Sequence, residues 1–97
     1  MGFDPAHPLR ASEAKTIVRQ ILEHGEVGFS AHARQELAND NMTTVDAINV
    51  LRAGVVHEPE WENGAWRYRA ETHRFCIVFE IESEDDCLVV TAWRFKR

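Results

Sequence analysis

Two runs rich in β-branched and aromatic residues near the end of the chain constrain its fold most strongly. They cover residues 75–81 and 87–95, and the polar segment 83–86 separates them. This pattern predicts a β-hairpin. Side chains alternate along a strand, and both runs carry apolar residues in both alternating sets of positions. We therefore expect two strands in the middle of a sheet, with other elements packed on each face.

An earlier hairpin is predicted by Asn63-Gly64, which favours a type I′ turn. The strand before it, residues 55–61, contains Pro59 and is therefore expected at a sheet edge. The turn also sets the register, because pairing one residue off would move every side chain to the opposite face. Outward from the turn, the predicted pairs are Glu62 with Ala65, Trp61 with Trp66, Glu60 with Arg67, Pro59 with Tyr68 and Glu58 with Arg69.

The first half of the chain is predicted to form three helices, because apolar residues recur there at helical spacing. The expected N-caps are Ser12, Ser30 and Thr43, and the expected last or stop residues are Gly25, Asn39 and Gly54. Before the first helix, residues 1–10 contain two prolines and no periodicity, so we expect an irregular arm. Residues 26–29 are a short segment that is compatible with an extended conformation.

A further turn within residues 71–74 completes a four-stranded antiparallel meander that follows the helices. The predicted fold class is therefore α+β, with the N-terminal helices packed on one face of a C-terminal four-stranded sheet. The chain has 97 residues, of which 44% are hydrophobic, and we expect one domain over residues 1–97. No apolar run approaches the ~20 residues of a membrane span. Residues 1–10 lack the pattern of a secretory signal, so we expect a cytoplasmic protein.

The two cysteines, Cys76 and Cys87, are predicted to be free thiols. The hairpin that turns at residues 83–86 separates them by about five residues of strand, on the order of 16 Å. A disulfide requires Cα atoms within about 7 Å. Two buried free thiols are consistent with a reducing compartment.

The charge distribution matters because the chain is acidic, with a formal net charge of −5 at pH 7. A nucleic-acid-binding protein of this charge must collect its basic residues in one place. The antiparallel meander is expected to do so, at the end of the sheet that holds the 71–74 turn. The basic residues expected at that end are Arg69, His73, Arg94, Lys96 and Arg97. Acidic residues are expected at the opposite end, which holds Glu84, Asp85 and Asp86 of the 83–86 turn and, beside the Asn63-Gly64 turn, Glu60 and Glu62.

Four short motifs resemble a bacterial family of domains of unknown function. They are Phe29-Ser30-Ala31-His32-Ala33-Arg34, the segment from Met42 that ends in Leu51-Arg52-Ala53-Gly54, Tyr68-Arg69, and Val89-Val90-Thr91-Ala92-Trp93. That family has an S-x-H-A start, a helix ending in Leu-x-x-Gly and a late Thr-Ala-aromatic strand. It is grouped with RelE-like toxins and is similar to the MqsR and BrnT toxins of toxin–antitoxin pairs.

The resemblance implies a RelE-like fold of helices on an antiparallel sheet. It also implies a small ribonuclease that cleaves messenger RNA without a metal or other cofactor and that a cognate antitoxin protein neutralises. Metal-free RNA cleavage requires a base for the 2′-hydroxyl, an acid for the leaving 5′-oxygen and cations on the phosphate. Histidine can serve in either proton role near neutral pH.

We expect His73 to donate or accept a proton, and Arg69, Arg74 and Lys96 to hold the phosphate. His32, which the resemblance marks, is a further candidate for the catalytic site. Additional RNA contacts are expected from Arg67, Arg94 and Arg97. His7, His24 and His57 are expected to be incidental, and the sequence has no zinc-ligand spacing and no glycine-rich phosphate loop.

A second hypothesis is a binding module of the same fold without catalysis. The edge strand, residues 55–61, together with Trp61, Trp66 and Tyr68, would suit docking of a protein or peptide. The acidic end of the sheet favours a basic partner. RNA cleavage and growth arrest on expression in bacteria would distinguish the enzyme from the binding module.

Overall fold

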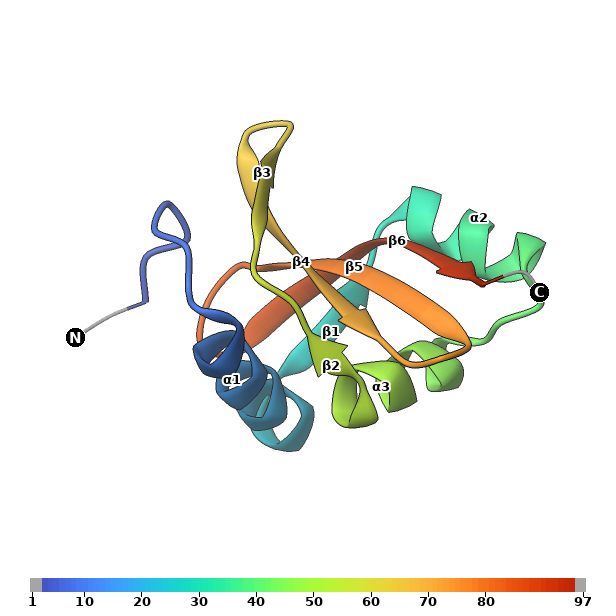
Figure 1. Cartoon of the computed structure of the whole chain (residues 1–97), viewed down its shortest axis with the longest axis horizontal. Coiled ribbons are helices and arrows are strands. Elements are labelled where there is room, and N and C mark those ends of the chain that lie inside the picture. The colour runs from blue at the N-terminus through green and yellow to red at the C-terminus, as the bar shows by residue number, and fades with distance from the viewer. Residues whose placement is uncertain (1–2, 96–97) are drawn as a thin grey trace.

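The computed structural model describes residues 3–95, which form three helices and a six-stranded sheet (Figure 1). The helices are α1 (Ala11–His24), α2 (Ala31–Asn39) and α3 (Thr44–Ala53). The strands are β1 (Glu26–Phe29), β2 (Val55–Val56), β3 (Glu60–Glu62), β4 (Ala65–Glu71), β5 (Phe75–Ile81) and β6 (Asp86–Arg94). None of the helices within this part of the chain is long and apolar enough to cross a membrane.

The sheet is larger than the predicted four-stranded meander. Its order is β1-β6-β5-β4-β2, and β3 also pairs with β4. The antiparallel hairpins β3–β4, β4–β5 and β5–β6 follow the prediction. The addition is β1, which pairs in parallel with β6, while the predicted edge strand 55–61 is divided into β2 and β3, which both pair with β4. The fold class α+β is confirmed, whereas the number of strands was wrong because the β1–β6 pair joins segments about sixty residues apart and leaves no local pattern.

Helices α2 and α3 begin at the predicted caps. The Ser30 hydroxyl accepts a hydrogen bond from the Ala33 N–H at 3.0 Å. Thr43 and Asp46 form a reciprocal capping box with distances of 3.1 and 2.9 Å. The prediction for α1 was wrong, because Arg10 and not Ser12 precedes the first turn, and the Glu13 carboxylate accepts from the Arg10 N–H at 3.0 Å.

The β5–β6 hairpin has the predicted form. Cys76 pairs with Trp93, and Ile81 pairs with Cys87. Both cysteines are free and buried, as expected. The register shifts between Val78 and Phe79, which leaves Val90 as an extra residue on β6. The Val90 carbonyl accepts a hydrogen bond from the Ser30 hydroxyl at 3.2 Å, so this bulge anchors the start of α2.

All three helices pack on the same side of the sheet. Their buried residues join one core cluster with Tyr68, Ile77, Phe79 and Val89, and Figure 1 shows α1 and α3 on one face with α2 along β6. Cys76 belongs to the opposite face, which we call the outer face, and it is buried but lies outside that cluster. The predicted packing of the helices on one face of the sheet is therefore confirmed, whereas the expectation of other elements packed on each face was wrong. On the outer face Cys76 and Val78 are nevertheless buried.

The β3–β4 hairpin projects from the body of the sheet (Figure 1). Its turn residues Asn63 and Gly64 have φ angles of 50° and 83°, which fit the predicted type I′ turn. The three pairs nearest the turn follow the predicted register, and the rings of Trp61 and Trp66 meet edge to face at 5.3 Å.

Farther from the turn the predicted register was wrong by one residue. Val56 pairs with Ala70, and Glu60 pairs with Arg67. The step between these two pairs is therefore four residues along the β2–β3 segment but only three residues along β4. The extra residue lies around Pro59, whose missing N–H cannot join a strand ladder. As a result, the His57 N–H donates to the Arg69 carbonyl at 2.9 Å, and His57 takes the place that was predicted for Glu58.

The N-terminal arm is irregular from residue 3 onward, as predicted, but it is fastened to the β3–β4 hairpin. The Trp66 indole N–H donates to the Ala6 carbonyl at 3.1 Å. The Leu9 N–H donates to the Tyr68 hydroxyl at 2.9 Å. These contacts hold the base of the hairpin against the body of the protein.

Candidate functional site

The outer face of the sheet carries most of the candidate functional side chains. Strand register brings Arg67, Arg69 and Glu71 of β4 to this face, next to Glu80 of β5 and Trp93 of β6. The two arginines are two residues apart on one strand, so their Cα atoms are about 7 Å apart. Because the helices lie on the other side, the guanidinium groups face away from the core.

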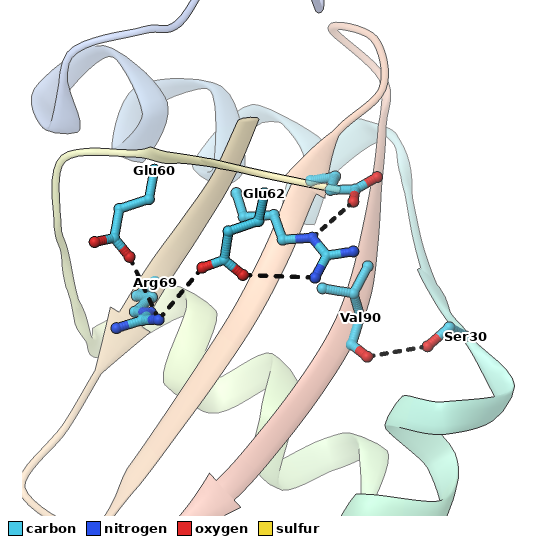
Figure 2. Close-up of polar contacts among 7 residues, drawn as sticks. Ser30, Glu60, Glu62, Arg69 and Val90 are labelled. Carbon is cyan, nitrogen blue, oxygen red and sulfur yellow. Dashed lines mark hydrogen bonds and ion pairs between the residues drawn. The ribbon is translucent and has the colours of Figure 1, made fainter. Parts of the chain in front are cut away.

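Five charged residues are joined by ion pairs on this face, and we call them the arginine–glutamate cluster: Arg67, Arg69, Glu60, Glu62 and Glu80. Figure 2 shows Glu60 and Glu62 beside Arg69. The Arg67 Nε donates a hydrogen bond to Glu80 at 3.1 Å. One carboxylate oxygen of Glu62 lies 3.7 Å from Arg67, and its other oxygen lies 3.6 Å from Arg69. Glu60 lies 3.4 Å from Arg69.

The two arginines differ in exposure and in support. The side chain of Arg67 is 22% exposed and is fixed by the Glu80 hydrogen bond. The side chain of Arg69 is 41% exposed, and its guanidinium lies 5.9 Å from the centre of the Trp93 ring. Arg69 is therefore the more accessible cation, and it stands beside an aromatic ring.

His57 is the residue that sequence reasoning missed. Its backbone bond to Arg69 places the two residues opposite each other, and opposite residues of a strand pair share a face. Its Nε2 lies 3.6 Å from a carboxylate oxygen of Glu71, which is an ion-pair distance and longer than a hydrogen bond. Pro59 was the available signal, since a proline in an edge strand marks a site where the register can shift.

An open hollow of about 520 Å³ adjoins these residues. Its lining is Ala53, Val55, His57, Glu71, Thr72 and His73. The hollow thus brings His73, the predicted proton-transfer residue, to the same surface as His57. The Thr72 hydroxyl accepts from the N–H groups of Arg74 and Phe75, at 3.2 and 3.1 Å, and shapes the turn that presents His73.

The structure separates the basic residues that were expected together at the end of the sheet near the 71–74 turn. Arg69 faces the carboxylates of Glu60 and Glu62 in place of Glu58, which the predicted register set opposite it, so it is not separated from the acidic residues. Arg94 lies on the core side of β6, where its guanidinium donates to the carbonyls of Asp40 and Asn41 at the end of α2, at 3.1 and 3.2 Å. Arg74 is exposed, and its guanidinium lies 5.8 Å from the centre of the Phe75 ring.

Arg94 also lies over the Phe75 ring, at 4.9 Å. Its guanidinium is engaged with the end of α2, which makes Arg94 a structural cap. His32 lies on the exposed side of α2, 3.9 Å from Glu36, and within residues 3–95 it forms no hydrogen bond or ion pair with the arginine–glutamate cluster. Lys96 and Arg97, which were also candidates, lie outside the described residues.

The thiols of Cys76 and Cys87 are poor candidates for a nucleophile. Burial, with a smaller contribution from Glu71, raises the pKa of Cys76 to about 12. Burial, together with Glu82 and Asp86, raises the pKa of Cys87 to about 12. Both groups remain protonated thiols near neutral pH, and a protonated thiol is a poor nucleophile.

Within residues 3–95, no three histidine, cysteine, aspartate or glutamate side chains are arranged to hold a metal ion. Comparisons of the chain with family models, with curated proteins and with solved structures found no match. The candidate site is therefore interpreted from its own geometry.

Proposed function

We propose that this protein is a metal-independent endoribonuclease that acts as the toxin of a bacterial toxin–antitoxin pair in the cytoplasm. The observation that carries the proposal is the position of His57 opposite Arg69 on the outer face. This arrangement joins a proton-transfer group to a phosphate-binding group. The S-x-H-A and Thr-Ala-Trp motifs resemble a family of domains of unknown function that is grouped with RelE-like toxins, which supports the same function.

RNA would bind along β4. Arg67 and Arg69 point to the same side, and a guanidinium can hold two phosphate oxygens in a planar fork. Trp93, next to Arg69, offers an aromatic surface on which an unpaired base can stack. Single-stranded RNA fits this combination, because its bases are free to stack while its backbone follows the cations.

The chemistry we propose is attack by the 2′-hydroxyl on the adjacent phosphate. His57, held beside Glu71, accepts the 2′-hydroxyl proton as the new O–P bond forms. Arg69 stabilises the charge on the phosphate in the transition state. His73 donates a proton to the 5′-oxygen as its bond to phosphorus breaks. The products are a 2′,3′-cyclic phosphate and a free 5′-hydroxyl.

The test is expression of the wild type and two single variants, His57→Ala and Arg69→Ala, in bacteria. We expect the wild type to arrest growth and fragment RNA, and each variant to be harmless. Arg19→Ala, which changes an exposed arginine on α1, is the matched control and should remain toxic. Purified wild type should leave 5′-hydroxyl ends, and a substrate with 2′-deoxy nucleotides should resist cleavage. A folded wild type that neither cleaves RNA nor slows growth would refute the proposal.

A protein-binding module remains the second candidate, and one observation favours it. Trp61 on β3 is 56% exposed, and Val55 on β2 is also an exposed apolar residue at the same edge of β4. Exposed aromatic residues are common at the centres of protein interfaces. Under this function, Trp61→Ala would abolish recovery of a partner, and His57→Ala would have no effect on it.

A further inference from the structure

Carboxylates of β3 already occupy the guanidinium groups that the proposed function assigns to RNA phosphates. Glu60 and Glu62 reach Arg69 at 3.4 and 3.6 Å, and Glu62 also reaches Arg67 at 3.7 Å (Figure 2). A carboxylate and a phosphate bind a guanidinium in the same way, through oxygen atoms that accept its N–H groups. The two ligands therefore compete for the same donors.

The glutamates of β3 are held more loosely than Glu80. Glu80 is 21% exposed and receives a hydrogen bond from Arg67 at 3.1 Å. Glu60 is 62% exposed, and the contacts of Glu60 and Glu62 are all 3.4 Å or longer. Exposed ion pairs of this length contribute little to stability. Their carboxylates can therefore leave the arginines by side-chain rotation, while Glu80 keeps Arg67 in place.

The position of the two glutamates follows from the hairpin. Alternation along Glu60-Trp61-Glu62 sends both carboxylates to the outer face and Trp61 to the other. The strand itself is held by its pairing with β4 and by the contact between Trp61 and Trp66. The carboxylates are not needed for that attachment, so removing their charge should leave the hairpin in place.

We propose that Glu60 and Glu62 are an autoinhibitory element that blocks the RNA-phosphate site in the free protein. An RNA strand must displace both carboxylates before it contacts Arg69. This inference rests on the proposed function, because it assigns the regulation of the same site.

The experiment measures binding of a fluorescein-labelled 2′-O-methyl oligonucleotide, which cannot be cleaved because its 2′-oxygen is blocked. We expect Glu60→Gln/Glu62→Gln to bind about tenfold more tightly than the wild type. The control is Glu82→Gln/Glu84→Gln, which removes the same charge from exposed positions at the β5–β6 turn. The control should change the affinity by less than about threefold, because its charges act only through screened solvent.

The outcomes separate the two proposals. If the Glu60/Glu62 variant binds no more tightly than the control while Arg67→Gln/Arg69→Gln weakens wild-type binding, autoinhibition is refuted and the RNA site stands. If neither the wild type nor the Glu60/Glu62 variant binds the oligonucleotide, both proposals fail. Circular dichroism of each variant, matched to the wild type, shows that the hairpin change did not unfold the protein.

Discussion

Lys15 on α1 forms hydrogen bonds with the segment that connects α3 to β2, and its replacement by methionine should destabilise the protein measurably. The Lys15 Nζ donates to the carbonyls of Leu51, Arg52 and Gly54, at 3.1, 2.8 and 2.8 Å. The Leu51 and Arg52 carbonyls lie in the last turn of α3, where carbonyls have no partner within the helix, and Gly54 follows the helix as its cap. The negative end of the helix dipole also favours an ammonium group there.

The expected loss of unfolding free energy follows from two opposing contributions. A hydrogen bond from a charged group contributes about 1.5–3 kcal/mol when it is well shielded. Burial lowers the pKa of Lys15, and nearby Arg19 lowers it further, so part of that gain is offset by lost hydration. Water can also reach the Arg52 carbonyl, because that bond is exposed. We expect Lys15→Met to lower the free energy of unfolding by about 1–2 kcal/mol and Tm by roughly 5–10 °C.

The assay is urea denaturation followed by tryptophan fluorescence, with Arg19→Met as the control. Arg19 lies one turn farther along α1 and is exposed, so its replacement should cost less than about 0.5 kcal/mol. Equal midpoints for the two variants would refute the structural role of Lys15. Because the α3–β2 corner leads directly to His57, the same variant should also lower RNA cleavage under the proposed function.

Three further predictions concern the hairpins and the core. Gly64→Ala should destabilise the protein by about 1 kcal/mol in urea, because Gly64 has a φ of 83°; an unchanged midpoint would contradict the turn assignment. Tyr68→Phe removes the acceptor of the Leu9 N–H and should cost about 1 kcal/mol, while a neutral result would mean that the arm finds water instead. Cys76 and Cys87 should react slowly with a thiol reagent in the native state and rapidly in urea. Folding raises both thiol pKa values from about 9.0 to about 12, so the unfolded state loses its thiol protons first. Unfolding should therefore become easier as the pH rises through that interval, and a pH-independent midpoint would contradict this.

Much of the local structure could be predicted from neighbouring residues. Asn63-Gly64 determined both the turn and the three pairs closest to it, because turn geometry acts directly on the adjacent residues. Ser30 and Thr43 marked two helix starts through side chains that reach only three residues along the chain. The distance between Cys76 and Cys87 along the hairpin also followed from the turn at 83–86.

The candidate site was predicted less well, because it depends on which strands meet. Arg67, Arg69 and His73 were named from the sequence, whereas His57 was set aside as incidental. Its position beside Arg69 results from one extra residue near Pro59, and a shift of one residue exchanges the faces of a strand. Arg94 was expected at the RNA surface, but the bulge and the end of α2 make it a cap.

The sequence by itself determined the α+β class, the order of helices and hairpins, and the buried thiols, because these depend on periodicity and turn chemistry within a few residues. Only the tertiary structure decided that β1 joins β6 and that Glu60 and Glu62 lie on the arginines. Such contacts join segments that are distant in the chain. They are selected by the packing of the whole fold, and no local pattern of residues specifies them.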